Sequence, residues 1–187
     1  MKPYSLRLCV IVWLSVLVMP LPAFSQVTVI FSRHAEKAAA PAKDPPLTLA
    51  GEQRAKVLAS MLADSGVDQI FVTELQRTQQ TAAPLAARTH VKPTIIPADD
   101  TDKLVKAIRD RKSGVVVVVG HSNKLPGIIA ALGGPTVTIP ETEYDNLYVL
   151  TVGASQSSLL RLHYGGLAPV PPVGGRMEPA MTGGPVK

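Results

Sequence analysis

Residues 115–123 read VVVVVGHSN. Five consecutive valines leave no polar face, which is the pattern of a central strand in a sheet that helices cover on both sides. β-branched side chains also favour an extended backbone. A strand is therefore predicted over residues 115–120, and it would present His121 directly at its carboxyl end.

Short β-branched runs alternate with amphipathic stretches on both sides of this strand. Further strands are predicted over residues 27–32, 69–73 and 92–97, and a closing hairpin over 146–152 and 157–164. Helices are predicted over 48–66, 77–89, 101–110 and 125–132. This alternation is typical of layered α/β domains, so the sequence predicts a three-layer sandwich in which helices flank a mostly parallel central sheet.

Apolar side chains three and four positions apart indicate which faces of two helices are buried. The helix over 48–66 is predicted to begin at Thr48, whose hydroxyl can cap it. Its expected apolar stripe consists of Val57, Leu58, Met61 and Leu62. The stripe expected for the helix over 101–110 consists of Leu104, Val105 and Ile108.

The first 25 residues are predicted to form a secretory signal peptide. Two cations precede an apolar run at 8–21, and the small residues Ala23 and Ser25 follow at the positions expected for cleavage. The run contains Pro20 and is shorter than the ~20 residues that a membrane helix needs, so an uncleaved anchor is the weaker alternative. We expect a periplasmic or extracellular protein with no stable membrane span after cleavage.

The remaining composition predicts one folded domain over residues 26–164 and a Pro/Gly-rich, disordered tail over 165–187. Hydrophobic residues make up 46% of the chain, which is enough for a core without disulfides, and its one cysteine, Cys9, lies in the predicted signal peptide. The net charge is +5, but the cations are scattered singly and aromatic residues make up 4%. This pattern argues against a nucleic-acid partner; the oligomeric state is left open.

Polar side chains follow each of the four predicted parallel strands. They are Arg33, His34, Glu36 and Lys37 after the first, Glu74 and Arg77 after the second, Asp99 and Asp100 after the third, and His121 after the fourth. Because ligands of open α/β sheets bind beyond the carboxyl ends of the strands, we expect these groups to meet at one edge.

Two arginines and two histidines suit a phosphoryl group. Arginine offers a planar fork of donors that matches phosphate oxygens and keeps its charge. A neutral imidazole can attack phosphorus to give a covalent phosphohistidine, and a carboxylic acid can protonate the leaving oxygen. The four histidines lack the close spacing of metal ligands, so no metal site is expected.

These residues and their neighbours resemble the histidine phosphatase superfamily, whose members include phosphoglycerate mutases and phosphohistidine phosphatases. The resemblance covers residues 27 to about 132 and rests on motifs in the expected order: Arg33-His34-Ala35-Glu36, then Pro46-Leu47-Thr48 with Gly51 and Arg54, then Thr73 with Arg77-Thr78 and Thr81, then Gly120-His121. It implies a phosphoglycerate mutase-like fold and a short, bacterial, exported member. It further implies that His34 is the phosphorylated nucleophile, that Arg33, Arg77 and His121 form the phosphate pocket, and that no metal or other cofactor is required.

The chain departs from the family pattern at Ala35, where Gly is usual, and at Thr73, where Ser is commoner. The proton donor is not fixed by the motifs. In the short bacterial branch the acid often follows the third strand, which favours Asp99 or Asp100, and Glu74 is the alternative. Glu36 is expected to orient a pocket cation rather than to transfer protons.

The resulting prediction is an exported phosphatase that hydrolyses a phosphomonoester or phosphohistidine-type substrate through phospho-His34. The substrate would be a small molecule or a phosphorylated component of the cell envelope. The alternative is a non-catalytic, phosphate-recognising binding or signalling module on the same fold.

Overall fold

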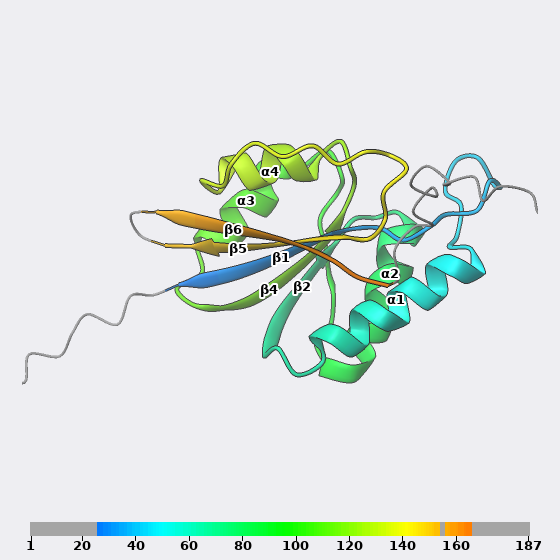
Figure 1. Ribbon diagram of the computed structural model, residues 1–187, viewed down its shortest axis with the longest axis horizontal. Coiled ribbons are helices and arrows are strands. Elements are labelled where there is room, and N and C mark those ends of the chain that lie inside the picture. Colours follow the sequence, from blue (N-terminus) through cyan, green and yellow to red (C-terminus); the bar gives the residue numbers. More distant parts are fainter. Residues whose placement is uncertain (1–25, 154–155, 166–187) are drawn as a thin grey trace, which may run out of the picture.

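The structure, a computed structural model, describes residues 26–153 and 156–165. A six-stranded sheet has the order β3-β2-β4-β1-β5-β6 (Figure 1). The strands are β1 (Val27–Arg33), β2 (Val67–Val72), β3 (Thr94–Ile95), β4 (Gly114–Gly120), β5 (Asn146–Val152) and β6 (Ser157–His163). The first four are parallel, and β5 and β6 form the predicted antiparallel hairpin at one edge. The prediction of a mostly parallel sheet is confirmed.

Four helices flank the sheet in the described part of the chain: α1 (Leu49–Leu62), α2 (Gln76–Thr89), α3 (Thr101–Arg109) and α4 (Leu125–Ala131). Figure 1 shows α1 and α2 on one face and α3 and α4 on the other. Each face has its own apolar core, so the valines of β4 alternate between the two: Val116 and Val118 pack on the side of α3 and α4, and Val117 and Val119 on the side of α1 and α2. The three-layer sandwich is confirmed.

The central position of β4 explains how distant segments meet. It pairs with β1 in a register that sets Arg33 opposite Gly120, and with β2 on its other side. The His34 amide continues the ladder by donating to the Gly120 carbonyl at 2.9 Å. The residues after β1, β2 and β4 are therefore neighbours at the carboxyl edge of the sheet.

The buried stripe of α1 differs from the sequence prediction. Thr48 caps the helix as expected, accepting from the Gly51 amide at 3.1 Å. Leu58 and Leu62 are buried, but Val57 and Met61 are exposed. The residues that share the inner face with the leucines are Gly51, Ala55 and Ala59. Gly51 and Ala55 are small because α1 packs closely there on the β1–α1 segment. The sequence prediction, which considered large apolar residues only, missed this part of the buried face.

The strand predicted over residues 92–97 is reduced to the two residues of β3. Two prolines, Pro93 and Pro97, bracket β3 and cannot donate to a ladder, which confines pairing at this edge. In α3, by contrast, Leu104, Val105 and Ile108 are buried as predicted.

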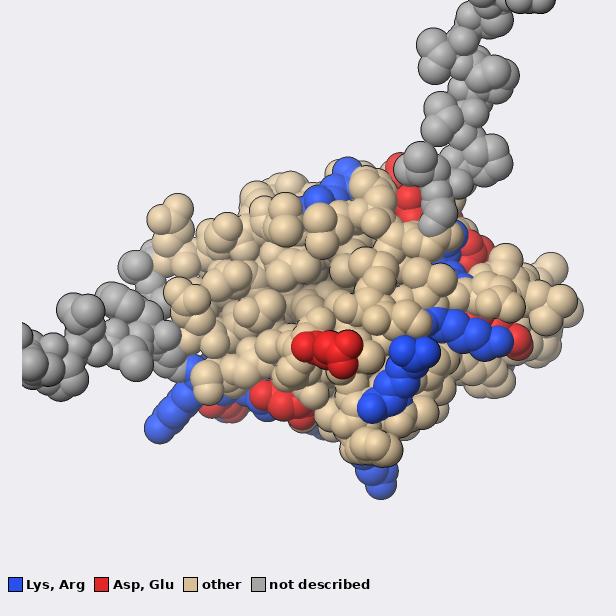
Figure 2. All heavy atoms as spheres, turned by 60° about the horizontal axis from the view of Figure 1, so that its bottom comes forward, with Lys and Arg blue, Asp and Glu red and all other residues tan. Residues whose placement is uncertain are grey.

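The predicted signal segment 1–25 and the predicted tail, apart from Gly165, lie outside the described residues. Among residues 26–153 and 156–165, no helix is long and apolar enough to cross a membrane. Figure 2 shows one face of the molecule, on which Lys and Arg side chains are dispersed and do not form a continuous patch. Several described cations pair with acidic neighbours, as in Lys106–Asp110, Arg111–Asp68 and Arg161–Glu143.

Candidate active site

His34 lies directly after β1 and is 4% exposed. Its Nδ1 is 2.8 Å from the Ala35 carbonyl oxygen. Because a carbonyl oxygen can only accept, Nδ1 carries the proton and Nε2 keeps its lone pair. Burial, opposed by this hydrogen bond and reinforced by the charges of Arg33 and Arg77, lowers the pKa of His34 to about 4. At neutral pH the residue is therefore an uncharged imidazole with a free Nε2.

Arg33 is fixed by the segment between α4 and β5. Its Nη1 donates to the carbonyl oxygens of Pro140 and Glu143 at 3.1 and 3.2 Å. The guanidinium carbon lies 4.2 Å from the centroid of the Tyr144 ring. Its buried Nε has no hydrogen-bond partner among the described residues. A fixed, buried cation with an unused donor is a ready anion ligand.

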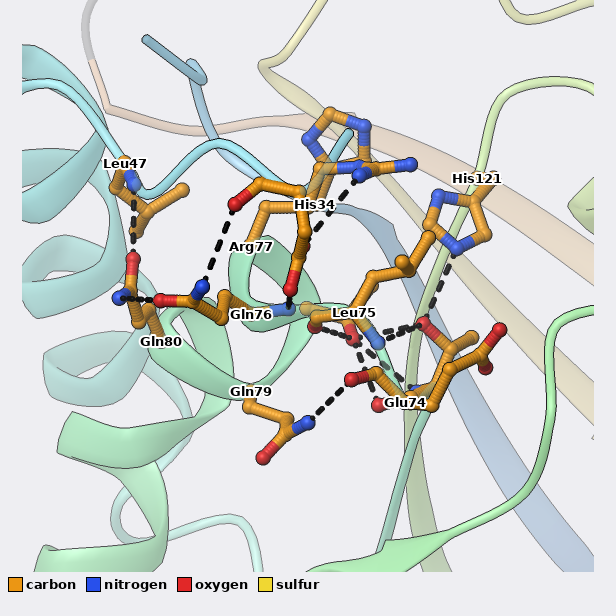
Figure 3. A network of polar contacts seen from close by, with 12 residues as sticks. His34, Leu47, Glu74, Leu75, Gln76, Arg77, Gln79, Gln80 and His121 are labelled. Carbon is orange, nitrogen blue, oxygen red and sulfur yellow. Dashed lines mark hydrogen bonds and ion pairs between the residues drawn. The ribbon is translucent and has the colours of Figure 1, made fainter. Parts of the chain in front are cut away.

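Arg77 reaches the same place from the first turn of α2. Its nearest carboxylate, Asp44, is 3.9 Å from Nη1, which is too far for a hydrogen bond. The Arg77 Nε is also buried and unpartnered within the described part of the chain. Figure 3 shows His34, Arg77 and His121 gathered at one point, although they come from three separate segments.

His121 follows β4 and is 7% exposed. The centroids of its ring and that of His34 are 5.5 Å apart, at an interplanar angle of 60°. Its Nε2 lies 3.1 Å from the hydroxyl of Thr73. Burial, with the charges of Arg77 and Arg33, lowers the pKa of His121 to about 4, so this imidazole is also neutral at pH 7.

The structure thus brings together His34, His121, Arg33 and Arg77, the residues that the motifs single out. It combines two cations that have free buried donors with two neutral imidazoles, one of which has a nucleophilic lone pair. This combination can grip a phosphoryl group and accept it on nitrogen. Within the described ranges, no group of three or more His, Cys, Asp or Glu residues is placed to hold a metal ion.

The sequence model of the histidine phosphatase superfamily (branch 1) matches residues 29–100, which include Arg33, His34 and Arg77. Over residues 29–100, a little more than a third of the chain, the sequence is similar to the histidine phosphatase superfamily. No curated protein sequence matches it.

Solved structures show that other proteins share this fold. The protein histidine phosphatase SixA, complexed with tungstate, is 18% identical, with a TM-score of 0.62 over 73% of this chain and 96% of that chain. An Escherichia coli K-12 protein proposed to be an alpha-ribazole-5'-P phosphatase is 16% identical, with a TM-score of 0.62 over 76% and 98%. An Agrobacterium tumefaciens protein proposed to be the phosphohistidine phosphatase SixA is 22% identical, with a TM-score of 0.56 over 72% and 97%.

The three carboxylates considered as proton donors have different surroundings in the structure. Asp99 is exposed and pairs with Lys124 at 2.9 Å, which lowers its pKa. Asp100 caps α3 and accepts from the Lys103 amide at 3.3 Å. Glu74 lies beside His121 in Figure 3, and one of its oxygens accepts from the Ala98 amide at 2.8 Å.

Glu36 does not orient a pocket cation. It binds Arg54 of α1, whose Nε donates to both carboxylate oxygens at 2.9 and 3.0 Å and whose Nη2 donates at 2.7 Å. Arg54 Nη1 also donates to the Tyr164 carbonyl at 2.9 Å. We call Glu36, Arg54 and Tyr164 the clamp. It holds the chain just after His34 and lowers the pKa of Glu36, against the effect of burial, through the Arg54 hydrogen bonds.

Hydroxyl groups also fix the segment that carries His34. Thr81 of α2 accepts from the Ala35 amide at 2.9 Å and donates to the Arg77 carbonyl at 2.6 Å. On the other side of the segment, Ser32 and the Tyr164 hydroxyl are hydrogen-bonded at 2.9 Å.

Sequence reasoning missed Tyr144, which lies against both Arg33 and the His34 ring, 6.1 Å between centroids. It stands in the irregular segment between α4 and β5, which has no strand or helix pattern to place it. The only available signal was its position just before the predicted strand over 146–152, where β5 runs antiparallel and so begins at the active-site edge.

Proposed function

We propose that this phosphatase hydrolyses a phosphomonoester or phosphohistidine-type substrate through a covalent phosphohistidine on His34, without a metal ion. The single observation that carries the proposal is the pair of buried, unpartnered guanidinium donors, on Arg33 and Arg77, beside an imidazole whose Nε2 is free. Buried polar groups without partners are costly, so such a pair is retained where a ligand supplies the partners.

In the proposed first step, His34 Nε2 attacks phosphorus and the bond from phosphorus to the leaving atom breaks; this atom is oxygen in a phosphomonoester and a ring nitrogen in a phosphohistidine. The electron pair goes to the leaving atom, which takes a proton from a carboxylic acid. The hydrogen bond from Nδ1 to the Ala35 carbonyl favours this step because it fixes the tautomer and stabilises the positive charge that develops on the ring.

In the second step, water attacks phosphorus, the Nε2–P bond breaks and its electron pair returns to nitrogen. One proton of the water goes to the carboxylate formed in the first step. Arg33 and Arg77 stay charged throughout and stabilise the equatorial oxygens in both transition states. Every proton and electron pair is accounted for, and each cycle returns the site to its starting state.

For the proton donor we propose Glu74. Its charge is one of those that act on His121, and it lies next to that ring (Figure 3). Asp99 is held ionised by Lys124, which makes it a poor acid. Asp100 and Glu74 each accept from one backbone amide, and Glu74 is preferred because its charge, unlike that of Asp100, acts on His121. The Glu74→Gln variant should lose most activity on esters with poor leaving groups but keep activity on aryl phosphates, which need no acid. If Asp100→Asn shows this pattern in its place, the donor is Asp100; if Asp99→Asn does, it is Asp99.

The substrate class follows from the same chemistry. SixA is named as a protein histidine phosphatase, and the Escherichia coli protein is proposed to act on a phosphate ester. The described site offers donors for the phosphoryl group alone, so both kinds of substrate fit it. Because residues 1–25 have the pattern of a signal peptide, we also propose that the protein is exported, where phosphorylated envelope components would be available.

A leaving-group series tests the proposal against the alternative of a non-catalytic module. The full chain would be assayed with aryl phosphates, alkyl phosphates and phosphohistidine, in buffer with excess EDTA. We expect turnover that rises as the leaving group improves and does not depend on added metal. Saturable phosphate binding with no turnover of any substrate would show that the protein is a binding module.

A further inference from the structure

Two threonine hydroxyls connect His121 to the start of α2. The Thr73 hydroxyl oxygen lies 3.1 Å from His121 Nε2 and 2.9 Å from the hydroxyl oxygen of Thr78. All three side chains are buried, so water does not compete for these contacts. Each hydroxyl has one proton, and the direction of each hydrogen bond can therefore be assigned by counting protons.

The proton of Thr78 is committed to the backbone. The Thr78 hydroxyl oxygen is 2.8 Å from the Leu75 carbonyl oxygen and 3.2 Å from the Thr73 carbonyl oxygen. Carbonyl oxygens only accept, and two oxygens at 2.8 Å repel unless a proton lies between them. Toward Thr73 the Thr78 oxygen can therefore only accept, which it does from the Thr73 amide at 3.1 Å and from the Thr73 hydroxyl.

The proton of Thr73 is thereby used as well. Its oxygen then accepts from the Leu75 amide at 3.3 Å and faces His121 Nε2 with a lone pair. A hydrogen bond forms at this contact only if the proton is on Nε2. The neutral His121 ring is left with an unprotonated Nδ1.

We infer that the Thr73–Thr78 hydroxyl pair is a positioning device that fixes His121 as the Nε2–H tautomer and so couples anion binding in the pocket to the uptake of one proton at Nδ1. The inference deepens the proposed function and rests on it in one respect, which is that the pocket binds a phosphoryl-type anion.

The charges around His121 explain why this proton is absent before an anion binds. Those that act on the ring come from Arg77 of α2, Glu74 before α2, Arg33 of β1, Lys124 before α4 and, weakly, Asp99 after β3; the neutral His34 ring lies 5.5 Å away. The cations outweigh Glu74 and, with burial, keep the pKa of His121 at about 4. A bound dianion reverses this balance and raises the pKa.

The coupling has a consequence for the substrate. A phosphomonoester in its monoanionic form brings the proton that Nδ1 needs, whereas the dianion must acquire it from solvent. The site should therefore prefer the monoanion, and kcat/KM should fall with rising pH above the second phosphate ionisation, at about pH 6. Thr73 acts on this preference through His121 and does not touch the substrate.

The direct test is nitrogen-15 NMR of the histidine rings in the full chain, before and after titration with sulfate. Sulfate is the probe because at pH 6 it has no proton to give. In the free wild type we expect His121 to have a proton on Nε2 and none on Nδ1, and with sulfate bound we expect protons on both. A free protein with the His121 proton on Nδ1 would overturn the inference.

Thr73→Val and Thr73→Ser form a matched pair for the same test, with proton uptake measured by calorimetry in buffers of different ionisation enthalpy. His34 is unchanged in both, so its contribution cancels. Thr73→Val frees His121 to place its proton on Nδ1, and uptake per bound sulfate should fall by most of one proton. Thr73→Ser should restore it. Equal uptake in all three proteins would refute the coupling but leave the phosphohistidine proposal intact, because that proposal is tested by labelling of His34.

Discussion

Two arginine-containing regions, the clamp with Arg54 and the pocket with Arg77, lie near the His34 segment and differ in how completely their guanidinium groups are hydrogen-bonded. In the clamp, Arg54 donates to both oxygens of Glu36 and to the Tyr164 carbonyl. In the pocket, Arg77 has no hydrogen bond to its own nearest carboxylate, Asp44, at 3.9 Å. The same side-chain type therefore has two different environments: Arg54 is bonded to the clamp, whereas the donors of Arg77 are left available for the phosphoryl group in the proposed function.

The difference is that no carboxylate lies within hydrogen-bond distance of Arg77 in the described part of the chain. A carboxylate within hydrogen-bond distance of Arg77 would compete with a phosphoryl group for the same donors. The carboxylate that does pair with an arginine is Glu36, which binds Arg54 and stabilises the turn just after His34, the proposed nucleophile. Removal of the arginine from one region at a time should therefore separate effects on catalysis from effects on the free energy of unfolding.

The largest expected effect is the contrast between Arg77→Ala and Arg54→Ala. Loss of Arg77 removes a donor that acts on the transition state, so kcat/KM should fall by about 10²–10³-fold with little change in the free energy of unfolding. Loss of Arg54 leaves the half-buried Glu36 carboxylate without its cation and should cost about 2 kcal/mol of stability. Assays of kcat/KM and chemical denaturation on both variants provide the measurement.

Each of these variants is the control for the other. If Arg77→Ala destabilised the protein as much as Arg54→Ala and kept its activity, Arg77 would be a structural residue and the pocket would lose one of its two cations.

A second comparison concerns how the free energy of unfolding changes as pH falls. Both pocket histidines have a pKa of about 4 in the folded protein against an ordinary value of 6.5, so the unfolded chain binds more protons as pH falls. Stability should therefore decrease from pH 7 to pH 5 by about 2 kcal/mol for each histidine. The clamp responds in the same direction but at lower pH: the pKa of Glu36 is lowered, so its stabilising contribution is lost as pH falls from the usual carboxyl range toward that lowered pKa.

Denaturation curves at a series of pH values test whether stability is lost first in the pH range of the histidines. His121→Asn should remove about half of the loss between pH 7 and pH 5, since one depressed histidine remains. An unfolding free energy that stays constant over that interval in the wild type would show that the imidazoles are not buried as described.

The smallest expected effect concerns the contact between α1 and the clamp. A Cβ on Gly51 would overlap the Glu36 carbonyl oxygen, so Gly51→Ala should push the Glu36 backbone away and cost about 2 kcal/mol. Thr48→Ala, a variant three residues earlier, removes the helix cap and a long hydrogen bond of 3.3 Å to the Glu36 carbonyl, and should cost about 1 kcal/mol. Thermal unfolding would rank the two; a Gly51→Ala protein as stable as the wild type would contradict the close packing.

Much of this architecture could be predicted because the deciding signals are local. The run of valines in β4 could be buried only between two layers, and His121 follows it directly. The carboxyl ends of β1 and β4 lie at one edge because parallel strands share an edge, as the fold class led us to expect, whereas the register that sets Arg33 opposite Gly120 is known only from the structure. The position of the motif residues at this edge of the sheet could therefore be predicted from the sequence.

The features that could not be predicted depend on contacts between distant segments. Tyr144 lies in irregular chain with no periodicity, and its contact with Arg33 exists only in the folded protein. The partner of Glu36 proved to be Arg54 because α1 packs closely over the turn, which its small residues permit. The choice among the acidic residues likewise depends on surroundings, since Asp99 and Asp100 have partners that spacing does not reveal.

The central claim is that His34 becomes phosphorylated, and trapping of the intermediate tests it most directly. The full chain would be mixed with a phosphoryl donor, quenched in alkali, digested and mapped by mass spectrometry. The account predicts an acid-labile phosphoryl group on His34, formed in the Glu74→Gln variant as well and absent from His34→Ala. A phosphoryl group on another residue, or none in a preparation that turns over substrate, would contradict the account.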